Sequence, residues 1–191
     1  MELDKLNLGC GEFKKEGFIN VDWGAFVNDA DVVHDLQSFP YPFSDDSMSL
    51  IEADHVLEHL SNPFALMCEL HRISKDSGIV IIRTPHFSRG FSHPEHKRGF
   101  DVSFPFYFKK DFVGGFQGVE FDLESQKLRW FAQPYLKKKH FSPSIFFVLS
   151  TLGRVFDLLA QASPALCSRL WCYWVGGFEE IEFIFRTKKK A

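Results

Sequence analysis

The five residues HVLEH, from His55 to His59, place two imidazoles and one carboxylate within a short stretch of chain. The pattern His-x-x-Glu-His binds zinc when both histidines lie on one helix face and a third ligand arrives from elsewhere. Here a strand-like run at 47–56 leads into the pattern, and Asn62-Pro63 begins the following helix. A corner of a ligand pocket, with Glu58 and His59 as rim or structural groups, is therefore favoured over a metal-dependent hydrolase, and no metal is expected.

Two glycines separated by one residue end an apolar run in LNLGCG, residues 6–11. Because glycine has no side chain, Gly9 and Gly11 let the backbone approach a ligand closely. The dinucleotide fingerprint would add a third glycine at position 14, where this chain has Lys14, and an acid about 20 residues further on. Asp22 follows Gly11 by only eleven residues (22 minus 11), so NAD is disfavoured. The Asp22 carboxylate can still accept from both hydroxyls of a ribose, and Asp35 from an adenine amino group.

Runs of strand length alternate with a helical pattern along the chain. Strands are expected at 5–9, 18–22, 31–36, 47–56 and 79–85. A helix is expected after Asn62, a suitable N-cap, and Pro63. The second half predicts a long loop at 87–108, a short helix at 109–117, a strand or hairpin at 119–131, a helical pair at 143–174 broken at Pro164, and a closing strand at 179–188. No repeat or linker divides the sequence, so residues 1–191 are expected to form one domain.

Four pieces of the first half occur in an order that resembles a known family. LNLGCGEFKKEGFINVDW is followed by DVVHDLQSFPYPFSDDSMSLIEADHVLEHL, and the likeness spans about residues 5–86. It is similar to the class I S-adenosylmethionine-dependent methyltransferases, specifically the small single-domain, type 11-like members. The resemblance implies an α/β fold: a Rossmann-like, doubly wound, mostly parallel seven-stranded sheet that binds its cofactor across the carboxyl ends of the strands. One departure is that only Glu12 to Gly17 separate the first two strands, so the family's usual first helix is reduced to a loop.

The resemblance also implies a cofactor and the residues that bind it. S-adenosylmethionine is the expected cofactor and S-adenosylhomocysteine the product. By position in the motifs, the methionine part is expected at Asn7, Leu8, Gly9, Cys10 and Gly11, the ribose at Asp22, the adenine at Trp23, Asp35 and Leu36, and the sulfonium side at His55 and Val56. Simpler roles stay open, because Asn7 could satisfy a strand edge, Trp23 could be core, and Asp35 could be a turn acid.

Methyl transfer from a sulfonium is an in-line displacement with a good leaving group, so a base is needed only when the acceptor must lose a proton. The loop HFSRGFSHPEHKRGF, residues 86–100, offers His86, His93 and His96 as candidates for that base. Arg89 and Arg98 are expected to hold an anionic acceptor. The histidines lack the spacing of a known zinc motif, and simple surface histidines remain an alternative.

The composition limits which binding partners and which cellular location are expected. The 191 residues carry a formal net charge of -3, which gives no overall attraction to nucleic acid, and no nucleic-acid partner is expected. The four cysteines form no CxxC pair and no cleavable signal is recognised, which predicts reduced thiols and a cytoplasmic location. The 23 phenylalanines predict a large apolar core, a greasy substrate pocket, or both.

Residues 141–178 form an aromatic-rich helical insertion before the last strand. Its most apolar run, Ile145 to Leu152, is bounded by Pro143, Arg154 and Asp157. That run is shorter than the roughly 18 residues of a membrane span, so no transmembrane segment is expected. Core packing, a cap over the acceptor, a homodimer face and an interfacial helix remain open.

The sequence as a whole predicts methyl transfer from S-adenosylmethionine to the oxygen or nitrogen of a small-molecule, glycan or lipid-precursor acceptor. A non-catalytic module that binds S-adenosylmethionine is the first alternative, because it would keep the glycine-rich loop and Asp22. The metal-dependent hydrolase that uses HVLEH is the more remote one.

Overall fold

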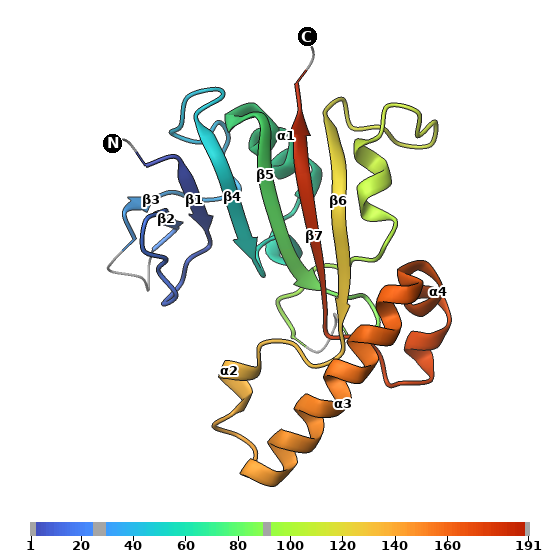
Figure 1. The fold of residues 1–191 in the computed structure, drawn as a ribbon. Coiled ribbons are helices and arrows are strands. Elements are labelled where there is room, and N and C mark those ends of the chain that lie inside the picture. Colours follow the sequence, from blue (N-terminus) through green and yellow to red (C-terminus); the bar gives the residue numbers. More distant parts are fainter. Residues whose placement is uncertain (1–2, 25–29, 90–92, 190–191) are drawn as a thin grey trace.

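A computed structural model describes residues 3–24, 30–89 and 93–189. Seven strands form one mixed sheet in the order β3-β2-β1-β4-β5-β7-β6 (Figure 1). The first five run parallel, and β7 is antiparallel to both of its neighbours. This confirms the expected α/β fold with a mostly parallel sheet. The strands are β1 (Lys5–Leu8), β2 (Ile19–Asp22), β3 (Val32–Val33), β4 (Met48–Asp54), β5 (Ser74–Pro85), β6 (Glu120–Arg129) and β7 (Glu180–Lys188).

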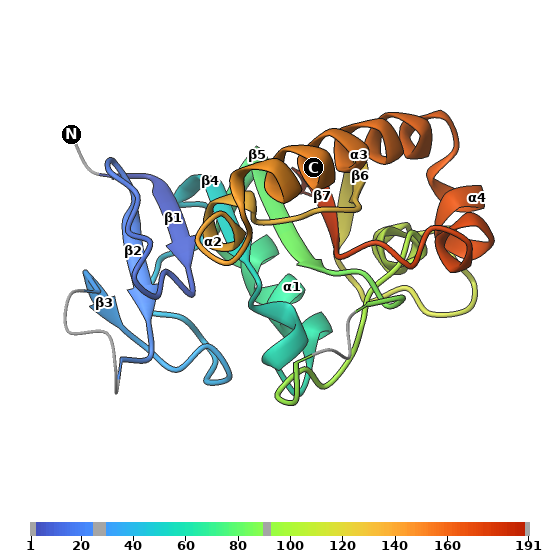
Figure 2. The same cartoon turned by 90° about the horizontal axis from the view of Figure 1, so that it is seen from below.

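Helix α1 (Pro63–Ile73) covers one face of the sheet (Figure 2). As expected, Asn62 is its N-cap, and the side-chain oxygen accepts from the backbone N–H groups of Phe64 and Ala65 at 3.1 Å. The helix ends at Ile73 because β5 begins at Ser74 in an extended conformation. Its inward stripe of Leu66, Met67, Leu70 and Ile73 is fully buried against the sheet.

Phenylalanine fills much of the core beside this helix. Phe183 and Phe185 on β7 point to the same face, where they meet the short helix η3 (Phe104–Phe108). The rings of Phe104 and Phe183 have centroids 5.7 Å apart, and those of Phe108 and Phe185 5.9 Å apart. Aromatic side chains bury large apolar areas, so these contacts account for part of the high phenylalanine content.

Three local expectations differ from the structure. Residues 109–117 form turns rather than a helix, because Gly114 and Gly115 in their middle disfavour helical backbone. Strand β3 is only two residues long. The Asp35 carboxylate accepts from the backbone N–H of Gln37, which turns the chain soon after the strand. A short helix α2 (Pro134–Lys137) lies where no helix was expected.

The helical pair before β7 is confirmed, with α3 (Pro143–Ala162) and α4 (Pro164–Arg169) broken at Pro164 and followed by η4 (Trp171–Tyr173). The helix continues beyond the apolar run, because Arg154 and Asp157 lie inside a continuous helix of 20 residues. On length and composition alone α3 could cross a membrane, which corrects the expectation that no segment is long enough. Helices α2 and α3 lie at the carboxyl end of the parallel strands, on the side of the sheet opposite α1 (Figures 1 and 2).

Candidate active site

A cleft of about 430 Å³ opens at the carboxyl ends of β1, β2 and β4. Its walls bring together residues from Gly9 to Glu95, which are 86 positions apart in the chain (95 minus 9). Seven of the residues expected to bind the cofactor line it: Gly9, Asp22, Trp23, Asp35, Leu36, His55 and Val56. Open α/β sheets bind ligands at this end, because the loops that follow adjacent parallel strands meet there.

Asp22 ends β2 with its carboxylate held in place by backbone donors. Gly11 donates its N–H to Oδ2 at 2.8 Å, and Trp23 donates its N–H to Oδ1 at 2.7 Å. Each carboxylate oxygen has a second lone pair, so both can still accept from a vicinal diol. The Trp23 side chain is 64% exposed at the cleft, so it is not a core residue and offers a free aromatic face.

Position 9 requires glycine because of its backbone conformation and the lack of space around it. Its φ of +64° is a conformation that favours glycine, and an added Cβ would lie 2.4 Å from Val56 Cγ2. The close approach joins the first loop to the residue that follows His55. Gly11 also has positive φ, but no atom of the described residues lies within 4 Å of the place where its Cβ would stand.

Asn7 and Leu8 of β1, and Cys10 in the loop that follows, lie behind the cleft rather than on its wall. Asn7 is buried, and its amide donates to Asn20 Oδ1 at 2.9 Å and to the carbonyl of Phe13 at 3.1 Å. Leu8 is core, and burial raises the pKa of the Cys10 thiol, which keeps it protonated. The structure therefore gives Asn7, Leu8 and Cys10 the role of shaping the loop.

Asp35 and Leu36 form the far wall of the cleft. The Asp35 side chain makes the turn that was one of its two expected roles, and it also borders the cleft. The carbonyl of Leu36 accepts from the buried Tyr41 hydroxyl at 2.8 Å, which fixes this segment against the core.

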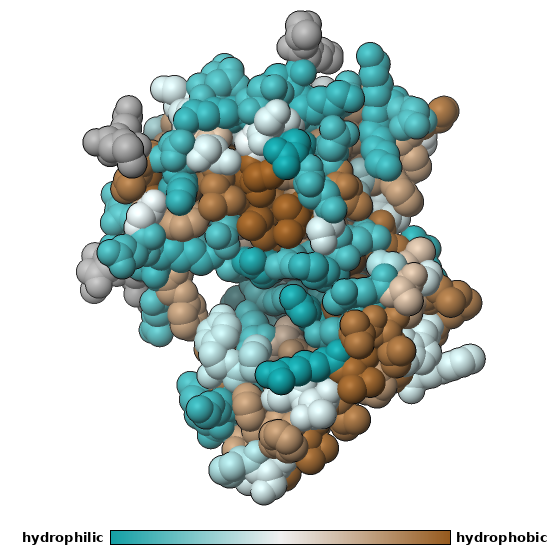
Figure 3. All heavy atoms as spheres, in the orientation of Figure 1, coloured by the Kyte–Doolittle hydropathy of each residue, from teal (hydrophilic) through white to brown (hydrophobic). Residues whose placement is uncertain are grey.

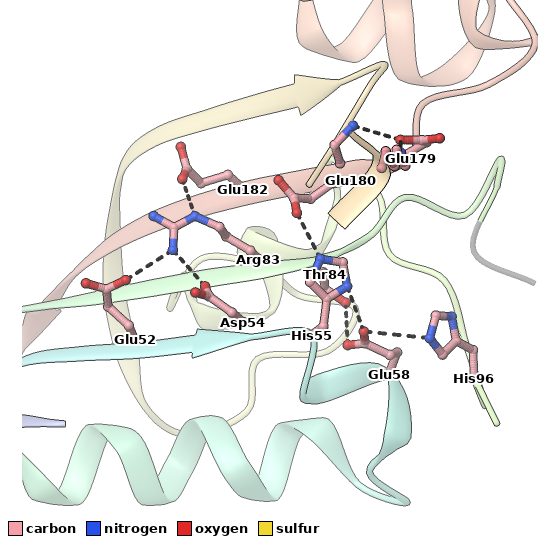
Figure 4. Close-up of polar contacts among 12 residues, drawn as sticks. Glu52, Asp54, His55, Glu58, Arg83, Thr84, His96, Glu179, Glu180 and Glu182 are labelled. Atoms are coloured by element: carbon pink, nitrogen blue, oxygen red, sulfur yellow. Dashed lines mark hydrogen bonds and ion pairs between the residues drawn. The ribbon is translucent and has the colours of Figure 1, made fainter. Parts of the chain in front are cut away.

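His55 directly follows β4 and connects this strand to other polar residues of the site (Figure 4). Its backbone has φ +56°, and its ring is 2.9 Å from Glu180 Oε2 and 3.2 Å from Glu58 Oε1. Burial acts to lower the pKa of His55, but the two carboxylates outweigh it and raise the pKa to about 9. The imidazolium therefore sits between two carboxylates at neutral pH, and the three groups together carry one net negative charge.

A second cavity, of about 800 Å³, adjoins the first. His55 and His59 line both, so they stand at the passage between them. His93 and His96, two of the candidate bases, line the second cavity. Residues 132, 133 and 137, which precede or belong to α2, also line it, whereas α3 contributes no lining residue.

His86 lines neither cavity, in contrast to its expected role. Its ring is fully buried, with one nitrogen 2.7 Å from Ser88 Oγ and the other 2.8 Å from Ser168 Oγ. Burial lowers the pKa of His86 to about 4, so the ring is neutral. Both nitrogens are occupied by hydroxyls, which argues against His86 as a base for an acceptor and for a role in tying β5 to α4.

The two arginines expected to hold an anionic acceptor differ in position. Arg89 lines the second cavity and lies 3.2 Å from Glu179 Oε1. Lys137 also contacts Glu179 and lines the same cavity. Arg98 donates instead to the carbonyl of Ser61 at 2.9 Å and is not among the lining residues.

HVLEH does not form a zinc-peptidase helix. His55 directly follows β4 and has both ring nitrogens paired with carboxylates, while Glu58 and His59 belong to the short helix η1 (Leu57–His59). The two histidines therefore do not share a helix face, which removes the ground for the hydrolase alternative.

Sequence inspection missed three groups that support the site. Glu180 is 125 residues from His55, and Thr84 donates to the buried Glu58 Oε2 at 3.1 Å across 26 residues. Glu179 lies on the wall of the second cavity. The alternation of the closing strand identified its apolar face but gave no signal for these polar contacts.

Comparisons with known proteins agree with this architecture. Residues 16–82 match the family described as methyltransferase domain, whereas none of the curated proteins matches the chain. An S-adenosylmethionine-dependent methyltransferase from Archaeoglobus fulgidus is 18% identical, with a TM-score of 0.56 over 96% of this chain and 85% of its own. The YcgJ protein of Bacillus subtilis is 14% identical, with a TM-score of 0.54 over 98% and 92%. The [4+2]-cyclase SpnF is 12% identical, with a TM-score of 0.53 over 97% and 74%, so the fold alone does not fix the reaction. The match and the shared fold confirm the resemblance to the class I S-adenosylmethionine-dependent methyltransferases.

Proposed function

We propose that the protein transfers the methyl group of S-adenosylmethionine to an oxygen or nitrogen of a small-molecule, glycan or lipid-precursor acceptor. The observation that carries this proposal is the arrangement of two adjoining cavities. The first collects seven of the residues expected at the cofactor, and the second, larger cavity meets it at His55 and His59. A displacement reaction needs this geometry, with the two reactants brought together at one passage.

The residues of the first cavity suit the parts of S-adenosylmethionine. Asp22 offers two acceptor oxygens to the ribose hydroxyls, and Trp23 offers an exposed aromatic face to adenine. When bound, the cofactor would supply an electrophilic methyl group and a neutral leaving sulfur. The cluster of His55, Glu58 and Glu180 carries one net negative charge, which favours a sulfonium cation nearby.

The second cavity supports catalysis over simple cofactor binding. A binding module would need no space beyond the cofactor cleft, whereas this cavity is the larger of the two. His93 on its wall is in a position to take a proton from an acceptor. Arg89 and Lys137 bring positive charge to it, although both are paired with Glu179.

Equilibrium dialysis with S-adenosylmethionine labelled in its methyl group tests the first half of the proposal. We expect saturable binding of one equivalent, displaced by S-adenosylhomocysteine. Lack of binding would contradict the proposed function. Incubation of the same complex with small-molecule, glycan and lipid extracts, followed by chromatography, then tests the second half. Binding without label in any acceptor fraction would favour the non-catalytic module.

A further inference from the structure

Three ligand groups of a kind that binds metals converge at the passage between the two cavities. The nearest donor atoms of Glu58, His59 and His96 all lie within 4.8 Å of one another. His59 and His96 line the second cavity, and Glu58 is fully buried. They come from η1 and from the loop that precedes η3. The backbone N–H of Lys97 donates to the carbonyl of Glu58 at 2.9 Å, which holds these two segments together.

The surroundings of Glu58 are those of an oriented ligand. Thr84 donates its hydroxyl to Oε2 at 3.1 Å, and His55 lies 3.2 Å from Oε1. Such outer contacts fix the direction of a metal-binding carboxylate and are a usual part of metal sites. One oxygen of Glu58 also lies 3.9 Å from His96 Nε2, so the carboxylate already faces the imidazole (Figure 4).

The imidazoles of this cluster pack against one another. The ring centroids of His59 and His96 are 5.0 Å apart, and His93 stacks on His96 at 4.8 Å. Donors of a tetrahedral zinc site lie roughly 3.4 Å apart, since Zn–N distances are about 2.0–2.1 Å. The donor atoms, which lie within 4.8 Å of one another, would close toward that spacing when the ion binds.

We propose that Glu58, His59 and His96 bind a first-row divalent metal ion such as Zn²⁺, with its open position toward the second cavity. Imidazole and carboxylate ligands suit this class of ion, and three protein ligands with one open position are typical of a catalytic site. The site differs from the zinc-peptidase pattern because His55 is an outer partner and His96 supplies the third ligand. We assign the ion the role of holding an acceptor oxygen beside the cofactor cleft. This role rests on the proposed function.

Titration of chelator-treated protein with Zn²⁺ by calorimetry, and with Co²⁺ by visible absorption, tests this site. We expect one equivalent to bind, and affinity to fall at least about 10-fold in Glu58→Gln and in His96→Ala. His140→Ala, an exposed histidine outside the site, serves as the matched control and should bind as the unchanged protein does. Equal binding by all variants, or no saturable binding, would overturn the site. Because S-adenosylhomocysteine affinity is measured on the same samples, a failed metal site is distinguishable from a failed cofactor site.

Helix α3 carries a second and independent signal, on the outside of the molecule. Ile145, Val148, Leu152, Val155 and Leu159 recur at alternating steps of three and four residues, and each is 42% exposed or more. They form one apolar stripe along the helix. The space-filling view shows apolar side chains gathered over this part of the molecule (Figure 3). Only 17% of the most apolar window of α3 is buried, so core packing does not account for its composition.

The inner side of α3 is fixed to the sheet. A Cβ on Gly153 would lie 2.8 Å from Phe131 Cβ, and the rings of Phe156 and Trp130 have centroids 5.1 Å apart. Asp157 is buried and accepts from the backbone N–H of Trp130 at 2.7 Å. Since this side is anchored, the helix can lie along a surface but would have to leave β6 in order to cross a membrane.

The segment that contains the stripe carries mostly positive charge. Between Trp130 and Phe178 the basic side chains are Lys137, Lys138, Lys139, Arg154 and Arg169, and the only acidic side chain is the buried Asp157. An apolar helix face in a segment rich in cations fits the surface of a bilayer with anionic headgroups.

We propose that α3 docks the protein on an anionic lipid surface, with the apolar stripe in the interface. Because α2 and α3 lie at the same end of the sheet as the second cavity, docking would place that cavity near the membrane (Figure 1). Among the acceptor classes of the proposed function, this favours a lipid or a lipid-linked molecule.

Sedimentation with vesicles of phosphatidylcholine alone, or mixed with phosphatidylglycerol, tests the docking. We expect binding to the anionic vesicles, weakened by salt, and at least about 10-fold weaker in Val148→Glu with Val155→Glu. Val113→Glu, an equally polar change at a fully exposed valine outside α3, is the control and should bind normally. Light scattering gives the mass of each variant without lipid. A stable dimer that does not bind vesicles, and that the double change dissociates, would overturn the lipid surface and assign the stripe to a second copy. Binding of S-adenosylhomocysteine, followed separately, shows whether the proposed function stands.

Discussion

A ring nitrogen of His55, directly after β4, lies 2.9 Å from a carboxylate oxygen of Glu180, at the start of β7. The contact joins the carboxyl end of a parallel strand to the beginning of the antiparallel one, at the passage between the two cavities. It also holds a histidine whose backbone has φ +56°, a region that costs most residues energy. The pair therefore stabilises both a local conformation and the wall of the candidate site.

Replacing Glu180 with Gln should weaken this contact without changing the size of the side chain. Glu180 is buried, so we expect the free energy of unfolding to fall by about 1–3 kcal/mol, the range for a hydrogen bond to a charged group. Urea unfolding followed by circular dichroism measures the change. Glu124→Gln is the control, because Glu124 pairs with Arg186 at an exposed position and should cost less than about 1 kcal/mol. Equal losses in the two variants would contradict the structural role of the pair.

Asp22→Ala should weaken cofactor binding, because it removes the acceptor oxygens expected at the ribose. We expect a loss on the order of 2–3 kcal/mol in the binding free energy of S-adenosylhomocysteine, measured by calorimetry. Asp122→Ala changes an exposed carboxylate on β6 and should leave the affinity unchanged. Asp22 also accepts from Gly11 and Trp23, so circular dichroism must show that the loop variant remains folded. Unchanged affinity in a folded variant would remove Asp22 from the site.

Much of the fold could be predicted from the sequence because its signals are local. Buried parallel strands appear as continuous apolar runs, and Asn62-Pro63 marks the start of α1 by its own side-chain chemistry. The same holds for the cofactor cleft. Gly9 follows β1, Asp22 ends β2, and Asp35 lies shortly after β3. Loops after neighbouring parallel strands meet in space, so strand order is enough to bring these residues together.

What could not be predicted depends on contacts between distant segments. The pattern predicted a helix through Arg154 and Asp157, but not that Asp157 is buried and pairs with Arg129 and Trp130. His86 looked like a site residue by type and position, yet Ser168 of α4 occupies its second nitrogen. Neither partner is near in sequence, so residue type alone suggested the wrong environment.

Gly9 and Gly11 should respond differently to substitution, although both have positive φ. Alanine at either position meets the strain of left-handed backbone, about 1–2 kcal/mol. At Gly9 the new Cβ also meets Val56 Cγ2 at 2.4 Å, whereas at Gly11 it meets no atom of the described residues within 4 Å. We therefore expect Gly9→Ala to cost about 1–3 kcal/mol more in unfolding free energy than Gly11→Ala. The double change Gly9→Ala with Val56→Ala should recover part of the difference. If the double change recovers none of it, the contact with Val56 is not the cause.

His86 should make stability depend on pH. Burial lowers its pKa to about 4, against 6.5 for the exposed ring, so the unfolded chain binds the proton more tightly. The contribution of the neutral ring is therefore fully present above about pH 6.5 and is lost as the pH falls toward 4, up to about 3 kcal/mol. His86→Gln should reduce the loss of unfolding free energy between about pH 7 and about pH 4.5, measured in urea. His140→Gln is the control, and an unchanged pH profile for His86→Gln would contradict the assignment.

Thr84 should affect the proposed metal site without being a ligand. Its hydroxyl is 3.1 Å from Glu58 Oε2, and its side chain is buried on β5, between β4 and β7. Thr84→Val keeps the shape of the side chain and removes the donor that orients the carboxylate. Loss of such an outer partner typically weakens metal affinity by about 10- to 100-fold, so we expect a change of that size in the Zn²⁺ dissociation constant by calorimetry. S-adenosylhomocysteine affinity should stay the same, because Thr84 does not line the cofactor cleft.

Thr187→Val is the matched control, since Thr187 is equally buried on β7 but donates to Ser74, away from Glu58. Equal Zn²⁺ affinity in Thr84→Val and Thr187→Val would mean that the hydroxyl of Thr84 does not orient a metal ligand.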